Sequence, residues 1–482
     1  MLKNLKHYSF NSIILSFLSL LSITILTKNL DIYNFGLIAL SILIGNIISS
    51  LLSLGIPQAT IRYYYESLNQ NPESISLDGF KRLNFINLFF IFIIHFIFLI
   101  FLIYLLDDLV IFLNLPGVDS KLILFAFFLG FVTKFYDYFT KLMIAEREAK
   151  RYSFVTLSFS ILLIITTYLF LYFHGGTYIS RIYSLIFCYL IFILLLMIKF
   201  RKNFTINFEI KYLIKSLKYS FPSVPEILLG LIGENFDKTF LAKIKSVGTL
   251  GIYDVSLRFS SFLKNLIDVI IKVWMPEFMT LAEKNDKEKI RSIYFCITFY
   301  MSTLCLFISY FAEEILILFT SKSFYVAKYY IPLISFSILI NHLFSFLSRS
   351  QNSFSKQLSK NLPGAIVYLL INVACNIYAI NFFGIYGACL TLIFSGIISS
   401  ILNFYLSNKN FYLNIKISNI LIKILNVLLF LLPLYVIYFL KINFLFGIFI
   451  KIILLFLFIF IFFKKEYLEK TIVNSFKSKF KI

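Results

Sequence analysis

Long runs of apolar residues recur along the whole chain, and short polar segments separate them. Most runs are near twenty residues, the length that an α-helix needs to cross a hydrocarbon core of about 30 Å. The pattern predicts an all-α polytopic membrane protein with about fourteen transmembrane helices. The predicted spans are residues 9–27, 36–56, 84–106, 122–144, 153–173, 179–199, 221–242, 252–275, 292–311, 331–349, 362–382, 384–406, 420–440 and 444–463.

The composition agrees with this pattern. Of the 482 residues, 60% are hydrophobic and 14% are charged, whereas a soluble globular chain carries about 25% charged residues. The spans occupy so much of the chain that no soluble catalytic domain fits beside them. The net charge of +21 does not indicate nucleic-acid binding, because the Lys and Arg residues lie in the short segments between apolar runs.

The same basic residues predict the orientation of the chain. Alternate connecting segments hold about thirty and about eight of them, and the richer set includes both ends of the chain. Cytoplasmic loops carry the excess of Lys and Arg in membrane proteins. We therefore expect both termini to be cytoplasmic.

Two pairs of similar turns indicate an internal repeat. Tyr33–Leu37 introduces the second span as Thr249–Tyr253 introduces the eighth, and Phe173–Gly176 precedes the sixth span as Phe382–Gly384 precedes the twelfth. The members of each pair are separated by about 210 to 220 residues, which is the length of six spans. An even number of spans gives both copies the same orientation, so a pseudo-twofold axis along the membrane normal should relate them.

The repeat predicts three parts. Residues 1–202 form an N-terminal six-helix bundle and residues 203–410 a C-terminal six-helix bundle. Residues 411–482 add two transmembrane helices and a basic cytoplasmic tail.

Charged residues inside the membrane are the candidate functional groups. Each costs about 2.5–3.5 kcal/mol at the bilayer centre, so it should face other helices or water. On the fourth and eighth spans these residues share one face at about 100° per residue. The set comprises Lys134, Asp137 and Lys141 in the fourth span; Glu226, Glu234, Asp237 and Lys238 in the seventh; and Asp254, Arg258, Lys264, Asp268 and Lys272 in the eighth.

Two interpretations of these charges remain open. In one, they line a water-filled cavity with a cationic bias that holds an anionic head group, and the Asp or Glu residues bind a proton or a sodium ion. In the other, the lysines reach the membrane surface from helix ends, and Asp137 with Lys141 or Asp254 with Arg258 are structural pairs.

The sequence offers no catalytic, metal or cofactor motif. The cysteines lie inside apolar runs without CxxC spacing, and the four histidines lack metal spacing. The chain contains no GxxxxGK[ST] or GxSxG motif. We therefore expect a protein that is not an enzyme and has no cofactor.

Several short motifs resemble those of bacterial polysaccharide and O-antigen flippases, which belong to the multidrug, oligosaccharidyl-lipid and polysaccharide exporter superfamily. The resemblance extends over nearly the whole chain. It is carried by Leu30–Leu37, Leu54–Ala59 with Arg62 and Tyr63, Phe236–Leu241, Val247–Tyr253, Trp274–Pro276, Asn372–Asn376 and Phe383–Ala388.

This resemblance implies a flippase in the bacterial inner membrane. Such a protein moves an undecaprenyl-diphosphate-linked oligosaccharide, an O-antigen or capsule repeat unit, from the cytoplasmic to the outer leaflet by alternating access. It implies membrane lipid and the lipid-linked oligosaccharide as partners, together with a polysaccharide polymerase and other assembly proteins.

The resemblance carries Arg62, Asp237, Lys238 and Arg258 over as cavity residues. Lys238 replaces an arginine that is frequent in the family, which keeps the charge but loses a bidentate fork for phosphate. Together with the charged spans this gives the predicted substrate cavity: Arg62, Lys134, Asp137, Lys141, Glu234, Asp237, Lys238, Asp254, Arg258 and Lys264.

Two alternatives are weighed against the flippase. Another exporter of the superfamily would carry cationic drugs or the cell-wall lipid precursor, although a drug exporter should have a mainly acidic cavity. A membrane polysaccharide polymerase would need a large outer loop, and the predicted outer loops are short.

Overall fold

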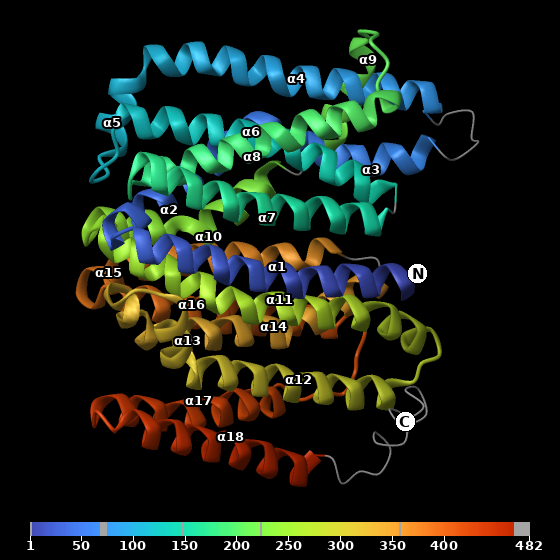
Figure 1. Cartoon of the computed structure of the whole chain (residues 1–482). Helices are drawn as coiled ribbons and strands as arrows, with labels where there is room; N and C mark the ends of the chain where they lie inside the picture. The colour runs from blue at the N-terminus through green and yellow to red at the C-terminus, as the bar shows by residue number, and fades with distance from the viewer. Residues whose placement is uncertain (1, 68–74, 147, 222–223, 356–357, 467–482) are drawn as a thin grey trace. The chain divides into compact units, whose positions relative to one another are not determined.

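The computed structural model describes residues 2–67, 75–146, 148–221, 224–355 and 358–466. Within these ranges every regular element is a helix (Figure 1). Twelve of the described helices are long and apolar enough to cross a membrane. The chain is the all-α polytopic protein that its pattern of apolar runs predicts.

The helices belong to two compact units, Met1–Asp254 and Val255–Ile482. The first unit holds α1 (Leu2–Asn29), α2 (Ile32–Ser53), α3 (Ile56–Ser67), α4 (Leu77–Tyr104), α5 (Leu106–Leu113), α6 (Ser120–Ala145), α7 (Ala149–His174), α8 (Tyr178–Phe200), η1 (Arg201–Asn203), α9 (Ile210–Ser220), α10 (Val224–Ile244) and the start of α11 (Val247–Glu283).

The second unit begins inside α11. Its other helices are α12 (Lys287–Tyr310), α13 (Ala312–Phe319), η3 (Lys322–Tyr329), α14 (Ile331–Phe354), η4 (Leu358–Asn361), α15 (Leu362–Phe383), α16 (Ile385–Asn408), α17 (Ile417–Phe439) and α18 (Phe444–Glu466). The predicted three-part division at residues 202 and 410 remains a prediction.

Every predicted span has its own helix, with ends shifted by up to eight residues. The spans predicted at 221–242 and 252–275 are α10 and α11, which carry too many charges to be counted among the twelve apolar helices. With 37 residues, α11 is about 55 Å long and exceeds the hydrocarbon core. The short helices α3, α5, α9 and α13 were not predicted, because they lie in the connecting segments.

In the first unit, α6 packs against α2, α3 and α8. Two glycines allow a close approach between α2 and α6: a Cβ at Gly45 would lie 2.3 Å from the carbonyl oxygen of Ala126, and a Cβ at Gly130 would lie 2.2 Å from that of Gly45. Any side chain at either position would separate the helices. Small residues give membrane helices their closest packing, because backbones then touch directly.

The starts of α2 and α11 have the same cap. Asp31 Oδ1 accepts a hydrogen bond from the backbone N–H of Asn34 at 2.7 Å. Ser246 Oγ accepts one from the backbone N–H of Thr249 at 3.1 Å. Each side chain therefore satisfies a donor that the helix itself leaves unpaired. The two acceptor residues are 215 positions apart in sequence (246 − 31), and so are the two donor residues (249 − 34), as an internal repeat requires.

The same two helix starts also contact each other within the first unit. A Cβ at Gly36 would lie 2.0 Å from the carbonyl oxygen of Val247, and a Cβ at Gly251 would lie 2.1 Å from that of Ile32. The two glycines are 215 positions apart (251 − 36), and so are the two residues whose carbonyls they meet (247 − 32). The two contacts are therefore equivalent, with the roles of the two helix starts reversed. A reciprocal contact of this kind is what a local twofold axis produces.

In the second unit, α14 packs against α12 and α16, and α15 packs against α16. The buried Gln351 amide fixes the chain beyond α16, donating to Asn408 Oδ1 at 3.0 Å and to the Phe411 carbonyl at 2.7 Å. Helices α17 and α18 pack against α12. The final pair of helices is thus part of this unit's packing.

Candidate functional site

A stripe of charge runs along α6 in the first unit. Lys134, Asp137 and Lys141 are all half-buried, so the single face predicted from their spacing remains partly accessible. Tyr138 shares the spacing but is buried, and its hydroxyl donates to Asn84 Oδ1 at 2.8 Å. The accessible face of α6 therefore contains the three charged residues but not Tyr138.

Arg62 lies on α3, which packs against α6. Its side chain is exposed, and its guanidinium carbon lies 5.2 Å from the ring centroid of Tyr219. A cation over an aromatic face is attracted by the negative charge of the ring face. This contact orients Arg62 without neutralising it, which leaves its hydrogen-bond donors available to an anion.

The predicted site residues of α10 and of the start of α11 are joined by direct contacts. Asp237 is 2% exposed. It accepts hydrogen bonds from the Tyr253 hydroxyl and, at 2.8 Å, from the backbone N–H of Lys238. Lys238 Nζ lies 3.5 Å from Asp254 Oδ1. The side chain of Glu234, also in the predicted site, lies outside the described residues.

These contacts tie α10 to α11. A buried carboxylate is stable only when hydrogen bonds or a counter-charge compensate for its lost hydration. Asp237 obtains that compensation from Tyr253, one helix away, and Asp254 obtains it from Lys238. The structure thus places these three predicted residues together, with both carboxylates buried and Lys238 half-buried.

On the second-unit part of α11, Arg258 is half-buried and Lys264 is exposed. One turn further, Asp268 Oδ1 lies 3.9 Å from Nε2 of His342 on α14. His342 Nδ1 lies 2.8 Å from the Ile338 carbonyl and so serves as a donor. This leaves Nε2 to face the carboxylate, and the pair becomes ionic when the imidazole is protonated. His342 was not predicted as a site residue because it lacks metal spacing, and Asp268 was a candidate charge of the eighth span that the predicted cavity does not include.

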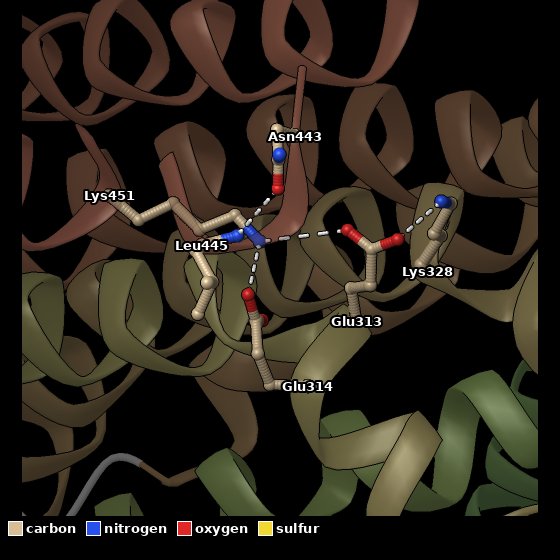
Figure 2. A network of polar contacts seen from close by, with 6 residues as sticks. All are labelled: Glu313, Glu314, Lys328, Asn443, Leu445 and Lys451. Atoms are coloured by element: carbon tan, nitrogen blue, oxygen red, sulfur yellow. Dashed lines mark hydrogen bonds and ion pairs between the residues drawn. The ribbon is translucent and has the colours of Figure 1, made fainter. Parts of the chain in front are cut away.

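A second charged cluster was missed entirely (Figure 2). Lys451 on α18 is 2% exposed, and its Nζ lies 2.7 Å from Glu314 Oε1 and 3.7 Å from Glu313 Oε2. Glu313 Oε1 is also 2.7 Å from Lys328 Nζ. The network joins α13, η3 and α18 with two acids and two bases. Its one sequence signal is the isolated lysine in the last apolar run, which does not reveal its partners.

Two further basic residues are buried in helices that the sequence analysis treated as apolar. Arg181 on α8 donates to Thr167 Oγ1 on α7 at 2.5 Å. Lys423 on α17 lies 3.9 Å from the ring centroid of Phe295 on α12. Both join neighbouring helices and are compensated by the contact. Among the described residues, no group of three His, Cys, Asp or Glu side chains is arranged to hold a metal ion.

Solved structures with the same fold are membrane transporters. The structure of "Lipid II flippase MurJ, inward closed conformation" gives a TM-score of 0.74 at 17% identity, and the match covers 95% of this chain and 98% of that one. An inward-facing multidrug resistance MATE family transporter of the MOP superfamily gives 0.66 at 16% identity, covering 82% and 94%. A MOP superfamily transporter from Pyrococcus furiosus gives 0.58 at 16% identity, covering 86% and 97%. The chain therefore has the fold of the MOP superfamily.

The family comparison covers the first part of the sequence. No curated protein matches the chain. Residues 1–282 match the family described as "Polysaccharide biosynthesis protein". That range is more than half of the 482 residues and contains all ten predicted cavity residues, while the resembling motifs at Asn372–Ala388 lie beyond it. The chain belongs to this polysaccharide biosynthesis protein family.

Proposed function

We propose that this protein flips an undecaprenyl-diphosphate-linked oligosaccharide, an O-antigen or capsule repeat unit, from the cytoplasmic to the outer leaflet of the bacterial inner membrane. The observation that carries the proposal is the partly accessible charged stripe of α6 in a chain of this family. Ionised groups at membrane depth are costly and occur mainly where they serve a substrate or ion pathway. The protein acts as a transporter rather than an enzyme, with both termini in the cytoplasm.

In the first unit, the accessible bases are the groups that contact the diphosphate. Lys134 and Lys141 on α6 supply point charges, and Arg62 on α3 supplies a planar donor fork that matches phosphate oxygens. Arg258 and Lys264 give the second-unit part of α11 its own basic surface. Asp137 balances the α6 lysines and is available to a proton or sodium ion. No cofactor is required.

The residues that join α10 to α11 have a different role in this proposal. Asp237, Lys238 and Asp254 position α10 against the start of α11 and do not touch the substrate. The interpretation of these residues as a structural set follows from the burial of the two carboxylates and from the mutual contacts of all three.

The membrane potential assists outward movement of the substrate. Each negative charge that moves from the cytoplasm toward the positive outer side gains about 2.3 kcal/mol per 100 mV. Consumption of the product by a polymerase on the outer side pulls in the same direction. Flipping therefore proceeds without ATP.

The cell-wall lipid precursor is the second candidate substrate. The observation that favours it is the similarity in fold to a structure named as a lipid II flippase. That precursor and the oligosaccharide carrier both present a lipid-linked diphosphate, so the same basic residues serve either. A cationic drug fits less well, because the accessible groups are mainly basic.

The test is leaflet-resolved detection of undecaprenyl-linked oligosaccharide in cells depleted of this protein. We expect the intermediate to build up in the cytoplasmic leaflet and wild-type protein to clear it. Arg62→Ala should slow clearance roughly tenfold or more, because a hydrogen bond to a charged group contributes about 1.5–3 kcal/mol. Lys121→Ala, which changes an exposed lysine outside the stripe, should clear it normally.

Two outcomes would redirect the assignment. Build-up of the cell-wall precursor instead of the oligosaccharide would favour the second candidate. Repeat units that reach the outer face but stay unpolymerised would overturn the flippase proposal and indicate an outer-face enzyme. The amount of each variant in the membrane is measured in parallel, so that loss of protein is not read as loss of transport.

A further inference from the structure

The linker that contains α9 exposes an apolar face that no other described part of its unit covers. Ile210, Ile214 and Phe221 are 57%, 59% and 60% exposed, and Ile206 just before the helix is 87% exposed. At about 100° per residue, Ile210, Ile214 and Phe221, which caps the end of α9, fall within a narrow arc on one side of the helix. Exposed large apolar side chains gathered in this way mark a contact with lipid or with another protein.

Another side of α9 is fixed on the unit, so the apolar face cannot turn inward. The Tyr63 hydroxyl donates to the Lys215 carbonyl at 2.9 Å, and Lys215 Nζ lies 2.7 Å from Glu66. Ser216 and Ser220 are buried, and Leu213 and Leu217, beside the exposed arc, are partly buried against the core of the unit. Helix α9 is therefore held on α3 and α4 with Ile210, Ile214 and Phe221 pointing outward.

Basic residues border this face. Lys211 and Lys218 are exposed on the flank of the arc, and Lys199, Arg201 and Lys202 are exposed just before it. The nearby acid, Glu209, is engaged by Arg82 and by Lys211 at 2.5 Å. Hydrogen bonds from Lys211 and Arg82 lower the pKa of Glu209, so it stays ionised, yet the linker keeps a net positive charge.

We propose that α9 lies in the cytoplasmic membrane interface and binds anionic phospholipid there, with phosphatidylglycerol head groups on Lys211 and Lys218 and acyl chains against Ile210, Ile214 and Phe221. Apolar residues beside flanking lysines are typical of helices that lie in the plane of an anionic membrane. The lipid surface is the occupant that matches both the apolar and the basic residues. This inference concerns bulk lipid and does not depend on the transported substrate.

The bound lipid would also support a predicted substrate residue. Tyr219 of α9 lies under the guanidinium of Arg62, and Lys215 holds Glu66 on the same helix, α3. Anchoring α9 in the interface thus fixes the helix that presents Arg62.

The experiment uses full-length protein with Ile214→Trp in phosphatidylcholine vesicles that contain either brominated phosphatidylglycerol or brominated phosphatidylcholine. Bromine quenches indole fluorescence only at short range. The native chain has one tryptophan, so wild-type protein gives the background. We expect the introduced indole to be quenched at least about twofold more by the brominated anionic lipid.

Matched charge variants test whether the lysines cause the preference for anionic lipid or whether the indole is merely buried in lipid of any charge. Lys211→Gln with Lys218→Gln should abolish the preference for anionic lipid, whereas Lys28→Gln with Lys121→Gln, which removes two exposed lysines elsewhere in the same unit, should keep it. Equal quenching by both lipids would overturn the anionic site. Quenching no greater than wild type would show that lipid does not reach the face, and would also overturn the proposal. Gel filtration confirms that each variant is folded.

Discussion

Lys451→Ala is expected to lower the free energy of unfolding by about 3–5 kcal/mol, which is the usual cost of removing one partner from a buried ion pair. Lys451 is the central base of the network in Figure 2, with Glu314 at 2.7 Å and Glu313 at 3.7 Å. Without it, Glu313 keeps Lys328, but Glu314 loses its base. A carboxylate left at that depth must stay ionised without a partner or take up a proton.

The measurement is unfolding in mixtures of dodecyl maltoside and SDS. The single tryptophan reports it, since Trp274 is buried in the same unit and donates to Ser350 Oγ at 2.9 Å. Lys322→Ala is the matched control: Lys322 is exposed on η3 beside the network, so its loss should change stability by less than about 0.5 kcal/mol. Equal effects of the two variants would contradict a role for the network in holding α18.

A double substitution separates the ion pair from the volume of the side chain. Lys451→Met with Glu314→Gln removes both charges while keeping similar shapes, so the destabilisation should be smaller than for Lys451→Ala. Glu314→Gln alone should be intermediate, because Lys451 retains Glu313. A double variant as unstable as the sum of Lys451→Met alone and Glu314→Gln alone would mean that packing, not charge, holds α18 to α13.

This network also marks the limit of what the sequence predicts. Span positions follow from apolar runs, because lipid requires about twenty apolar residues in each helix. The i, i+3, i+7 stripe of Lys134, Asp137 and Lys141 follows from helix geometry alone. The partner of Lys451 does not, because Glu314 is 137 residues away and only tertiary packing brings it near.

The sequence also does not show which charged residues of the candidate site are buried. Asp237 and Lys134 both read as charges in apolar spans, yet Asp237 is fully buried beside Tyr253 and Lys134 stays partly accessible. The difference arises from which helix covers each face, and a single sequence does not contain that information. Helix α9 was missed for another reason: its eleven residues are too few to span a bilayer, so a search for spans passes over it.

The sequence indicates the repeat because both copies have a glycine at the equivalent position. Gly36 and Gly251 were found as similar turns, and the structure gives their physical reason: each is the point where one helix start touches the backbone of the other. We expect Gly36→Ala and Gly251→Ala each to lower stability by about 1–3 kcal/mol, as overpacking does. The two losses should be similar, because the contacts exchange equivalent residues.

The matched control lies one turn away on α11. The three nearest atoms to a Cβ at Gly248 would be side-chain atoms, of Ile32 at 3.3 and 3.4 Å and of Ser246 at 3.9 Å, so Gly248→Ala should be nearly neutral. Thermal unfolding is followed with a thiol-reactive dye, since Cys188 is buried in the same unit. An unchanged midpoint for Gly36→Ala or Gly251→Ala would mean that the two helix starts do not touch.

The double variant is the stricter test of the reciprocal contact. The first alanine pushes the two helix starts apart, and this separation relieves part of the second clash before the second alanine is added. Gly36→Ala with Gly251→Ala should therefore cost less than the sum of the single variants, as expected for residues that share one contact. Independent sites would give additive losses, so additivity would contradict the local twofold even if both single variants were destabilised.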